Sequence, residues 1–162
     1  ALIDKKEIFL KDLSSFFKKG NSNCLCKVVR YEMYELKIRD YCFVAHSLKD
    51  EFFGPAKNLH GVTYVVDLII SSKELIEKNV IIDIGIANKV LKNVIAQYNY
   101  KNLDEIDKFN NHITTTEYMA KQFVDDICME LQNINYPINK LYSVKIELKE
   151  NHIASASYIK TI

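Results

Sequence analysis

The sequence predicts an α+β domain in which an antiparallel sheet carries two helices on one face. Apolar and polar residues alternate in segments near residues 34–46, 62–70, 144–148 and 153–159, as they do in half-buried strands. Between the second and third of these segments, apolar residues recur at spacings of three and four, as in amphipathic helices. The order strand-strand-helix-helix-strand-strand is typical of an α+β domain.

The first strand pair is predicted on either side of a loop from Ser47 to Leu59, which contains the turn signal Gly54-Pro55. The first strand ends at His46, and the second begins at His60. The apolar residues that share one face of the second strand are Val62, Tyr64, Val66, Leu68 and Ile70.

Two helices are predicted next. The stripe of the first is Ile86, Val90, Leu91, Val94, Ile95 and Tyr98. The second begins near Thr114, which has the spacing of a capping box with Glu117, and ends before Tyr136-Pro137. Its stripe is Met119, Ala120, Phe123, Val124, Ile127 and Leu131.

The last strand pair turns at Glu150-Asn151, and Ile153–Ile159 forms the final strand. Such a sheet leaves strand edges that association of subunits can pair, so a homo-oligomer is expected. Residues 1–30 form a separate arm whose stretch from Asp4 to Lys19 reads as an amphipathic helix. The arm covers a sheet or a neighbouring subunit, and a helix lying on a membrane surface is the alternative.

Composition limits the classes of partner. The formal net charge is +1, so no positive field attracts nucleic acid. No run approaches the roughly 20 apolar residues that span a bilayer. The four cysteines form no zinc-binding pair, and without a signal peptide we expect reduced thiols in the cytoplasm. Two disulfides in a secreted chain are the alternative.

Two groups of residues are candidates for chemistry. If the first two strands pair as a hairpin, His46 and His60 face each other across its mouth. Imidazole suits zinc, but a catalytic zinc needs three protein ligands, and a buried histidine paired with a carboxylate is the commoner arrangement. Glu150, with Thr115 and Thr116, can bind a heterocycle that presents adjacent N–H donors, the alternative being an exposed turn glutamate.

Six short motifs in this order resemble the 6-pyruvoyl-tetrahydropterin synthase superfamily, which includes the 6-carboxytetrahydropterin synthases. They are Phe43 to His46, Leu59-His60-Gly61-Val62-Thr63-Tyr64, Val80 to Ile84, Asn99 to Leu103, Thr115-Thr116-Glu117, and Glu150 with Tyr158. The resemblance implies a ββααββ domain of the T-fold (tunnelling fold) type over residues 31–162 and a trimer or hexamer. It also implies a pterin-like ligand held by Glu150, Thr115 and Thr116.

The chain departs from the family at its chemical positions. One of the three family zinc histidines is replaced by Val62, so zinc would be held by His46, His60 and tentatively His152. Ala56 stands at the position of the family's cysteine, and Asn99-Tyr100 at its Asp-His pair.

Three functions follow from these departures. The first is a divergent, metal-dependent lyase acting on a pterin or a related purine-derived ring, with Tyr100 and His152 as candidate catalytic residues. The second is a non-catalytic pterin-binding module that kept the pocket but lost the catalytic side chains. The third is a structural or interaction protein that binds no pterin.

Overall fold

The computed structural model describes residues 32–162. The predicted helix from Asp4 to Lys19, the rest of the predicted arm, and Cys24 and Cys26 lie outside the described residues. The strands are β1 (Tyr34–His46), β2 (His60–Ser72), β3 (Lys101–Asn102), β4 (Ser143–Lys149) and β5 (Ser155–Thr161), and the helices are α2 (Ile84–Ala96) and α3 (Thr116–Asn133). Short 3-10 turns join them: η1 (Glu51–Lys57), η2 (Glu77–Asn79), η3 (Leu103–Glu105), η4 (Asp107–Phe109) and η5 (Ile138–Lys140).

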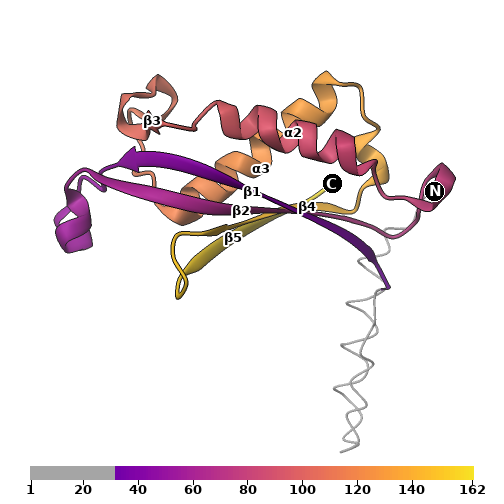
Figure 1. The fold of residues 1–162 in the computed structure, drawn as a ribbon, viewed down its shortest axis with the longest axis horizontal. Helices are drawn as coiled ribbons and strands as arrows, with labels where there is room; N and C mark the ends of the chain where they lie inside the picture. Colours follow the sequence, from indigo (N-terminus) through magenta and orange to yellow (C-terminus); the bar gives the residue numbers. More distant parts are fainter. Residues whose placement is uncertain (1–31) are drawn as a thin grey trace, which may run out of the picture. The chain divides into compact units, whose positions relative to one another are not determined.

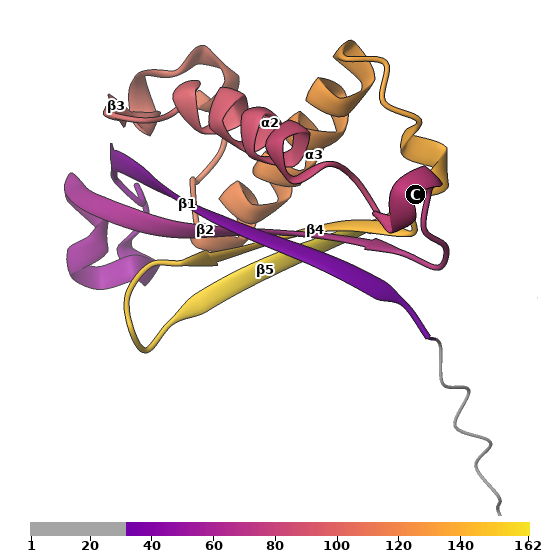
Figure 2. The ribbon, with the colours of Figure 1, turned by 45° about the vertical axis from the view of Figure 1, so that its right-hand side comes forward.

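The described strands form one sheet in the order β3-β1-β2-β4-β5, and α2 and α3 lie on the same side of it (Figures 1 and 2). The β1–β2, β2–β4 and β4–β5 pairs are antiparallel. This confirms the predicted fold class. The short strand β3, which runs parallel to β1, was not predicted.

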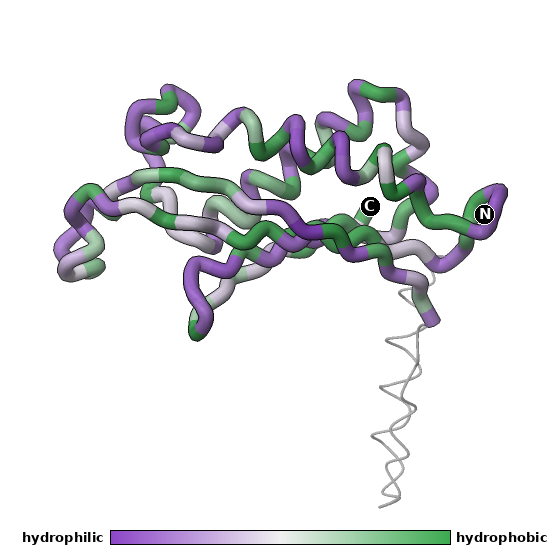
Figure 3. Tube along the Cα trace, viewed as in Figure 1, coloured by the Kyte–Doolittle hydropathy of each residue, from purple (hydrophilic) through white to green (hydrophobic). Residues whose placement is uncertain are grey.

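The core lies between the sheet and the two helices. Even-numbered residues of β2 and β4 face it because successive side chains of a strand alternate between its faces. All six residues of the predicted α3 stripe are buried. In α2 the buried stripe begins at Ala87, since Ile86 lies in the first turn with 39% of its surface exposed. Figure 3 shows mostly hydrophobic colouring along the middle of the sheet and a largely hydrophilic β4–β5 turn.

The Asp83 side chain marks the start of α2 and lies close to Gly85. The Asp83 carboxylate accepts a hydrogen bond from the Ile86 amide at 3.0 Å and so caps the helix. A Cβ added at Gly85 would lie 2.9 Å from Asp83 Oδ1, too close for an ordinary contact.

Within residues 32–162 no helix is long and apolar enough to cross a bilayer.

The final strand begins two residues later than predicted. The Asn151 side chain accepts hydrogen bonds from the amides of Ile153 and Ala154, both at 2.9 Å, and this side-chain turn extends the loop. Ile153 is therefore in the turn, with 85% of its surface exposed, and β5 starts at Ser155.

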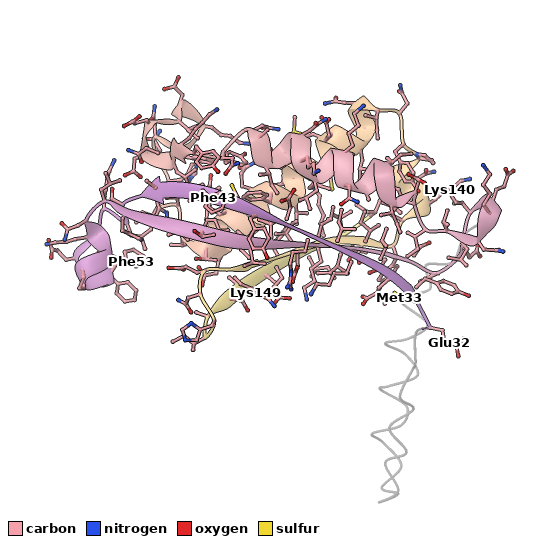
Figure 4. All side chains as sticks on the ribbon, in the orientation of Figure 1. Glu32, Met33, Phe43, Phe53, Lys140 and Lys149 are labelled. Carbon is pink, nitrogen blue, oxygen red and sulfur yellow. The ribbon has the colours of Figure 1, made fainter. Side chains whose placement is uncertain are left out.

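The face of the sheet opposite the helices carries a buried carboxylate. Asp67 has no exposed side-chain surface, and it accepts two hydrogen bonds from the Arg39 guanidinium, at 2.6 and 2.8 Å. Lys37 Nζ lies 2.7 Å from Asp67 Oδ2, and Lys149 Nζ lies 3.8 Å away. Figure 4 shows Lys149 on this side of the sheet. Burial alone would raise the pKa of Asp67, but the hydrogen bonds from Arg39 and Lys37 outweigh it and hold the pKa at about 2.

Replacing this carboxylate should change stability in a pH-dependent way. Because the pKa of Asp67 is lowered in the folded state, its ion pairs stabilise the fold above the unfolded pKa, and that stability is lost as pH falls towards 2. We expect Asp67→Asn to lower the free energy of unfolding at pH 7 by about 2 kcal/mol. Urea unfolding of both proteins at pH 7, 4 and 2.5 should show the difference shrinking with acid.

Glu147→Gln is the matched control. Glu147 lies on the same face and is paired only at 3.9 Å, with Lys149. It should change the free energy of unfolding by less than about 0.5 kcal/mol. Equal losses in the two variants would show that the Asp67 pairs carry no special stability.

Candidate functional site

A cavity of about 210 Å³ lies where β1 ends and β2 begins. Figure 4 shows Phe53 at this end of the sheet and Lys140 and Met33 at the other end. The lining comes from the end of β1, η1, the start of β2, the start of α3, and the β4–β5 turn. The lining residues are His46, Leu48, Phe53, Ala56, His60, Thr115, Thr116, Glu117, Glu150, Ala154, Ser155 and Ala156.

The two predicted histidines lie side by side in this cavity. His46 and His60 are directly paired at the last position of the β1–β2 ladder, and their ring centroids are 4.6 Å apart with the planes tilted by 56°. His60 Nδ1 lies 2.8 Å from the Asn58 backbone oxygen, which can only accept, so Nδ1 carries the proton and a neutral His60 has a bare Nε2. His46 Nδ1 lies 3.0 Å from Thr114 Oγ1.

The buried ring of His46 has an unused nitrogen. Its side chain is only 2% exposed, and its Nε2 has no hydrogen-bond partner in the part of the chain that the structure describes. Burial lowers the pKa of His46, and the neighbouring His60 lowers it further; Thr114, Glu150 and Asp104 act in the opposite sense. The net direction is downward, so His46 is neutral at pH 7 with a nitrogen that needs a partner.

The start of α3 differs from the predicted capping box. Thr115, not Thr114, is the N-cap residue, and its hydroxyl oxygen accepts a hydrogen bond from the Tyr118 amide at 3.3 Å. Thr114 is 1% exposed and its hydroxyl contacts His46 instead. The spacing to Glu117 predicted Thr114 as the N-cap residue. The helix begins one residue later, and the Thr114 hydroxyl contacts His46 and does not cap the helix.

Glu150 lies in the same cavity as the histidines. It follows the last residue of β4, and the Thr116 hydroxyl donates a 2.7 Å hydrogen bond to Glu150 Oε2. Within residues 32–162 the structure gives Oε1 no hydrogen-bond partner. The exposed carboxylate is thus held by one hydroxyl and has acceptor capacity left for a ligand.

The two candidate catalytic residues are not in the cavity lining. Tyr100 has 80% of its surface exposed and a left-handed backbone (φ 59°), and its ring stacks on Phe43 with centroids 5.3 Å apart. The side chain of Asn99 accepts a hydrogen bond from the Phe43 amide at 2.8 Å. His152 lies exposed in the β4–β5 turn.

The tentative zinc ligands are likewise not all brought together. Among residues 32–162 there is no group of three or more His, Cys, Asp or Glu side chains that could hold a metal ion. Val62, at the position of the family's third histidine, is 8% exposed on the same face of β2 as His60. The residues present therefore do not fit a tightly bound zinc, which requires three protein ligands and an open position. Cys42 is fully buried, and burial raises its pKa to about 12.

The sequence analysis missed two buried residues that interact with residues of the cavity lining. Thr114 was assigned to the helix cap, and nothing in the sequence places its hydroxyl beside His46. Tyr64 was assigned only to the core, but its buried phenol has no hydrogen-bond partner among residues 32–162. Burial raises the pKa of Tyr64. An interaction of Tyr64 with Thr116 lowers this pKa by less than burial raises it. The sequence did contain one indication of this, because Tyr64 places a polar hydroxyl group on the otherwise apolar face of β2.

Comparison with solved structures identifies the fold. Among solved structures, 6-pyruvoyl tetrahydropterin synthase of Caenorhabditis elegans has a TM-score of 0.68 and 21% identity, with 82% of this chain and 99% of that chain covered. The enzyme of Plasmodium vivax gives a TM-score of 0.67 and 14% identity, with 81% and 99% covered. The fold is therefore the T-fold of these enzymes, as predicted.

Sequence comparison then establishes the family. The sequence model of 6-pyruvoyl tetrahydropterin synthase matches residues 35–160. The 6-carboxy-5,6,7,8-tetrahydropterin synthase of Bacillus subtilis (strain 168) is 23% identical over 129 residues, which are 77% of this chain and 84% of that protein. The chain belongs to the 6-pyruvoyl tetrahydropterin synthase family, and the predicted resemblance is confirmed.

The buried, neutral His46 should make the fold sensitive to mild acid. Because its pKa is lowered in the folded state, the unfolded chain takes up a proton near pH 6.5 before the folded chain does. Stability is then fully present above pH 6.5 and declines below it. We expect the melting temperature to fall between pH 7.5 and 5.5, and the fall to be smaller in His46→Gln.

The matched control is His112→Gln, because His112 is exposed and stacks on Tyr118 outside the cavity. It should leave the pH dependence of the melting temperature unchanged. The assignment to His46 is wrong if His46→Gln and His112→Gln both follow the unmodified protein from pH 7.5 to 5.5.

Proposed function

We propose that this chain binds a pterin or a related purine-derived ring in the cavity at the end of the β1–β2 hairpin. The observation that carries the proposal is that Glu150 and Thr116 line one cavity together with His46 and His60. A ring-binding carboxylate and two imidazoles thus meet although they come from distant parts of the chain.

Glu150 supplies the recognition. An ionised carboxylate only accepts hydrogen bonds, and it can accept two in parallel from adjacent N–H groups. Pterins and guanine-like rings present such a pair along one edge. The hydrogen bond from the Thr116 hydroxyl fixes Oε2 and so restricts the orientation of the carboxylate before the ring arrives. This lowers the ordering cost of binding.

The histidines would face the substituent of the ring. His46 is neutral and has an unpartnered buried Nε2, which can accept a hydrogen bond from the ligand or donate one to it, according to the tautomer of the ring. In family enzymes a bound zinc would polarise a substrate oxygen at such a site. Since the described residues give that metal too few ligands, no step of the proposal depends on it.

The cavity favours binding without the family's lyase reaction. Ala56 lines it at the position of the family's cysteine, and neither Tyr100 nor His152 is among the lining residues. Removing a general acid or base typically costs about 10²–10⁴-fold in rate. We therefore propose a pterin-binding protein that kept recognition and gave up this chemistry. The second candidate, a divergent lyase, is favoured by His46 and His60, which are the imidazoles in the cavity.

A homo-oligomer, trimeric or hexameric, remains part of the proposal. Its support is the solvent-facing edge of β5 and the exposed apolar residues on and beside the sheet, including Tyr34, Tyr41 and Ile159. Sizing by analytical ultracentrifugation tests it directly.

Removing the Glu150 charge should abolish most of the binding. We expect Glu150→Gln to weaken binding of pterin or guanine roughly 10–100-fold, since a hydrogen bond to a charged group is worth about 1.5–3 kcal/mol. Thr116→Val should weaken it less, because only the hydroxyl that orients the carboxylate is lost. Isothermal titration calorimetry measures both.

Glu147→Gln is again the control, because Glu147 lies three residues earlier and does not line the cavity. It should leave the dissociation constant within about twofold of the unmodified protein. If the unmodified protein bound none of these rings, or if Glu150→Gln bound them as tightly, the proposed function would be wrong.

The two candidate functions differ in turnover. We expect dihydroneopterin triphosphate to be recovered intact after incubation with the protein, as followed by liquid chromatography and mass spectrometry. We also expect Tyr100→Phe and His152→Ala to leave ring binding unchanged. Conversion of the compound at a rate abolished by Tyr100→Phe or His152→Ala would instead establish the divergent lyase.

A further inference from the structure

We infer that the His46–His60 pair works without a metal, as a hydrogen-bonding site for the ligand's substituent, and that Val62 is the residue that keeps zinc from binding there. The role in ligand binding rests on the proposed function. The part that concerns zinc does not, and it can be tested without any ligand.

The position of Val62 follows from the pleat of the hairpin. Residues 60 and 62 are two apart on β2, so their side chains share one face at a spacing of roughly 6.5–7 Å. Val62 pairs with Val44, which is two residues before His46 on the same face of β1. Position 62 is thus next to His60 along the strand and diagonal to His46 across the ladder.

Each imidazole is already oriented through its Nδ1. His60 Nδ1 contacts the Asn58 carbonyl oxygen at 2.8 Å, and His46 Nδ1 contacts the Thr114 hydroxyl at 3.0 Å. Both contacts orient the rings and leave each Nε2 for another partner. The carbonyl also fixes the tautomer of His60, whereas the Thr114 hydroxyl can donate or accept. The buried His46 Nε2 lacks that partner among residues 32–162, so water, a ligand group or an ion is left to supply it.

The number of available metal ligands decides whether the partner of His46 Nε2 can be a zinc ion. Zinc needs at least three protein ligands, and within residues 32–162 no third His, Cys, Asp or Glu side chain forms with the pair a group that could hold a metal ion. Val62, two residues from His60 on the same face of β2, is 8% exposed and has no atom that could bind a metal. The cavity is therefore suited to a ring whose substituent brings its own hydroxyl or N–H donor and requires no polarising metal.

Zinc content of the full chain tests this inference. Protein saturated with zinc and passed through a desalting column should retain far less than one zinc ion per chain by elemental analysis. Val62→His adds a third imidazole on the same face, and it should retain about one ion and bind zinc at least about 100-fold more tightly. The double variant His60→Ala with Val62→His should lose this gain.

A second variant at position 62 and a binding measurement with a chelator complete the test. If Val62→His does not fold, Val62→Cys offers a smaller side chain whose thiolate is also a zinc ligand. Pterin binding to the unmodified protein should be the same with and without a chelator. About one zinc ion retained by the unmodified protein would overturn the inference, as would folded variants that bind no more zinc than it does. Absence of pterin binding would overturn the proposed function and leave the result on zinc intact.

Discussion

The antiparallel pairing of β1 with β2 is the constraint on which the rest of the structure depends. The register runs from Tyr34 opposite Ser72 to His46 opposite His60. A slip of one residue would turn every side chain of one strand to the other face and separate the histidines from the cavity. The same register places Arg39 opposite Asp67, and their ion pair lies on the other face of the sheet. Stability and site geometry therefore rest on one alignment.

Three consecutive threonines connect the sheet to the start of α3. Thr114 contacts the ring of His46, Thr115 caps the helix, and Thr116 holds the carboxylate of Glu150. Each hydroxyl thus has a different task, on a backbone that turns from an extended to a helical conformation. The helix start fixes the histidine side of the cavity relative to the carboxylate side, which explains how residues from opposite ends of the domain form one site.

The cavity contains side chains that can form hydrogen bonds to a ligand, but it lacks the side chains proposed for catalysis. Glu150 and Thr116 line it together with the small side chain of Ala56, whereas Val62 is buried on β2 next to His60 and does not line it. Outside the cavity, Tyr100 stacks on Phe43 and contributes to the packing at the edge of β1. The side chains of Ala56 and Val62 can neither carry a proton nor bind a metal. This arrangement is the one that the proposed binding function requires.

The sequence by itself determined the fold class, because alternation with a period of two and helical spacing report directly which face of each element is buried. It also placed His46 and His60 at the mouth of a hairpin, on condition that the two strands pair, whereas the register that sets them opposite each other was decided by the tertiary structure, because the long loop from Ser47 to Leu59 does not fix it. The role of Thr114, the true start of β5, and the exclusion of His152 from the cavity were decided only by the tertiary structure. These features depend on a hydroxyl from residue 114 meeting a ring from residue 46, and on the Asn151 side chain reshaping a turn. Contacts between distant residues leave no periodic trace in the sequence.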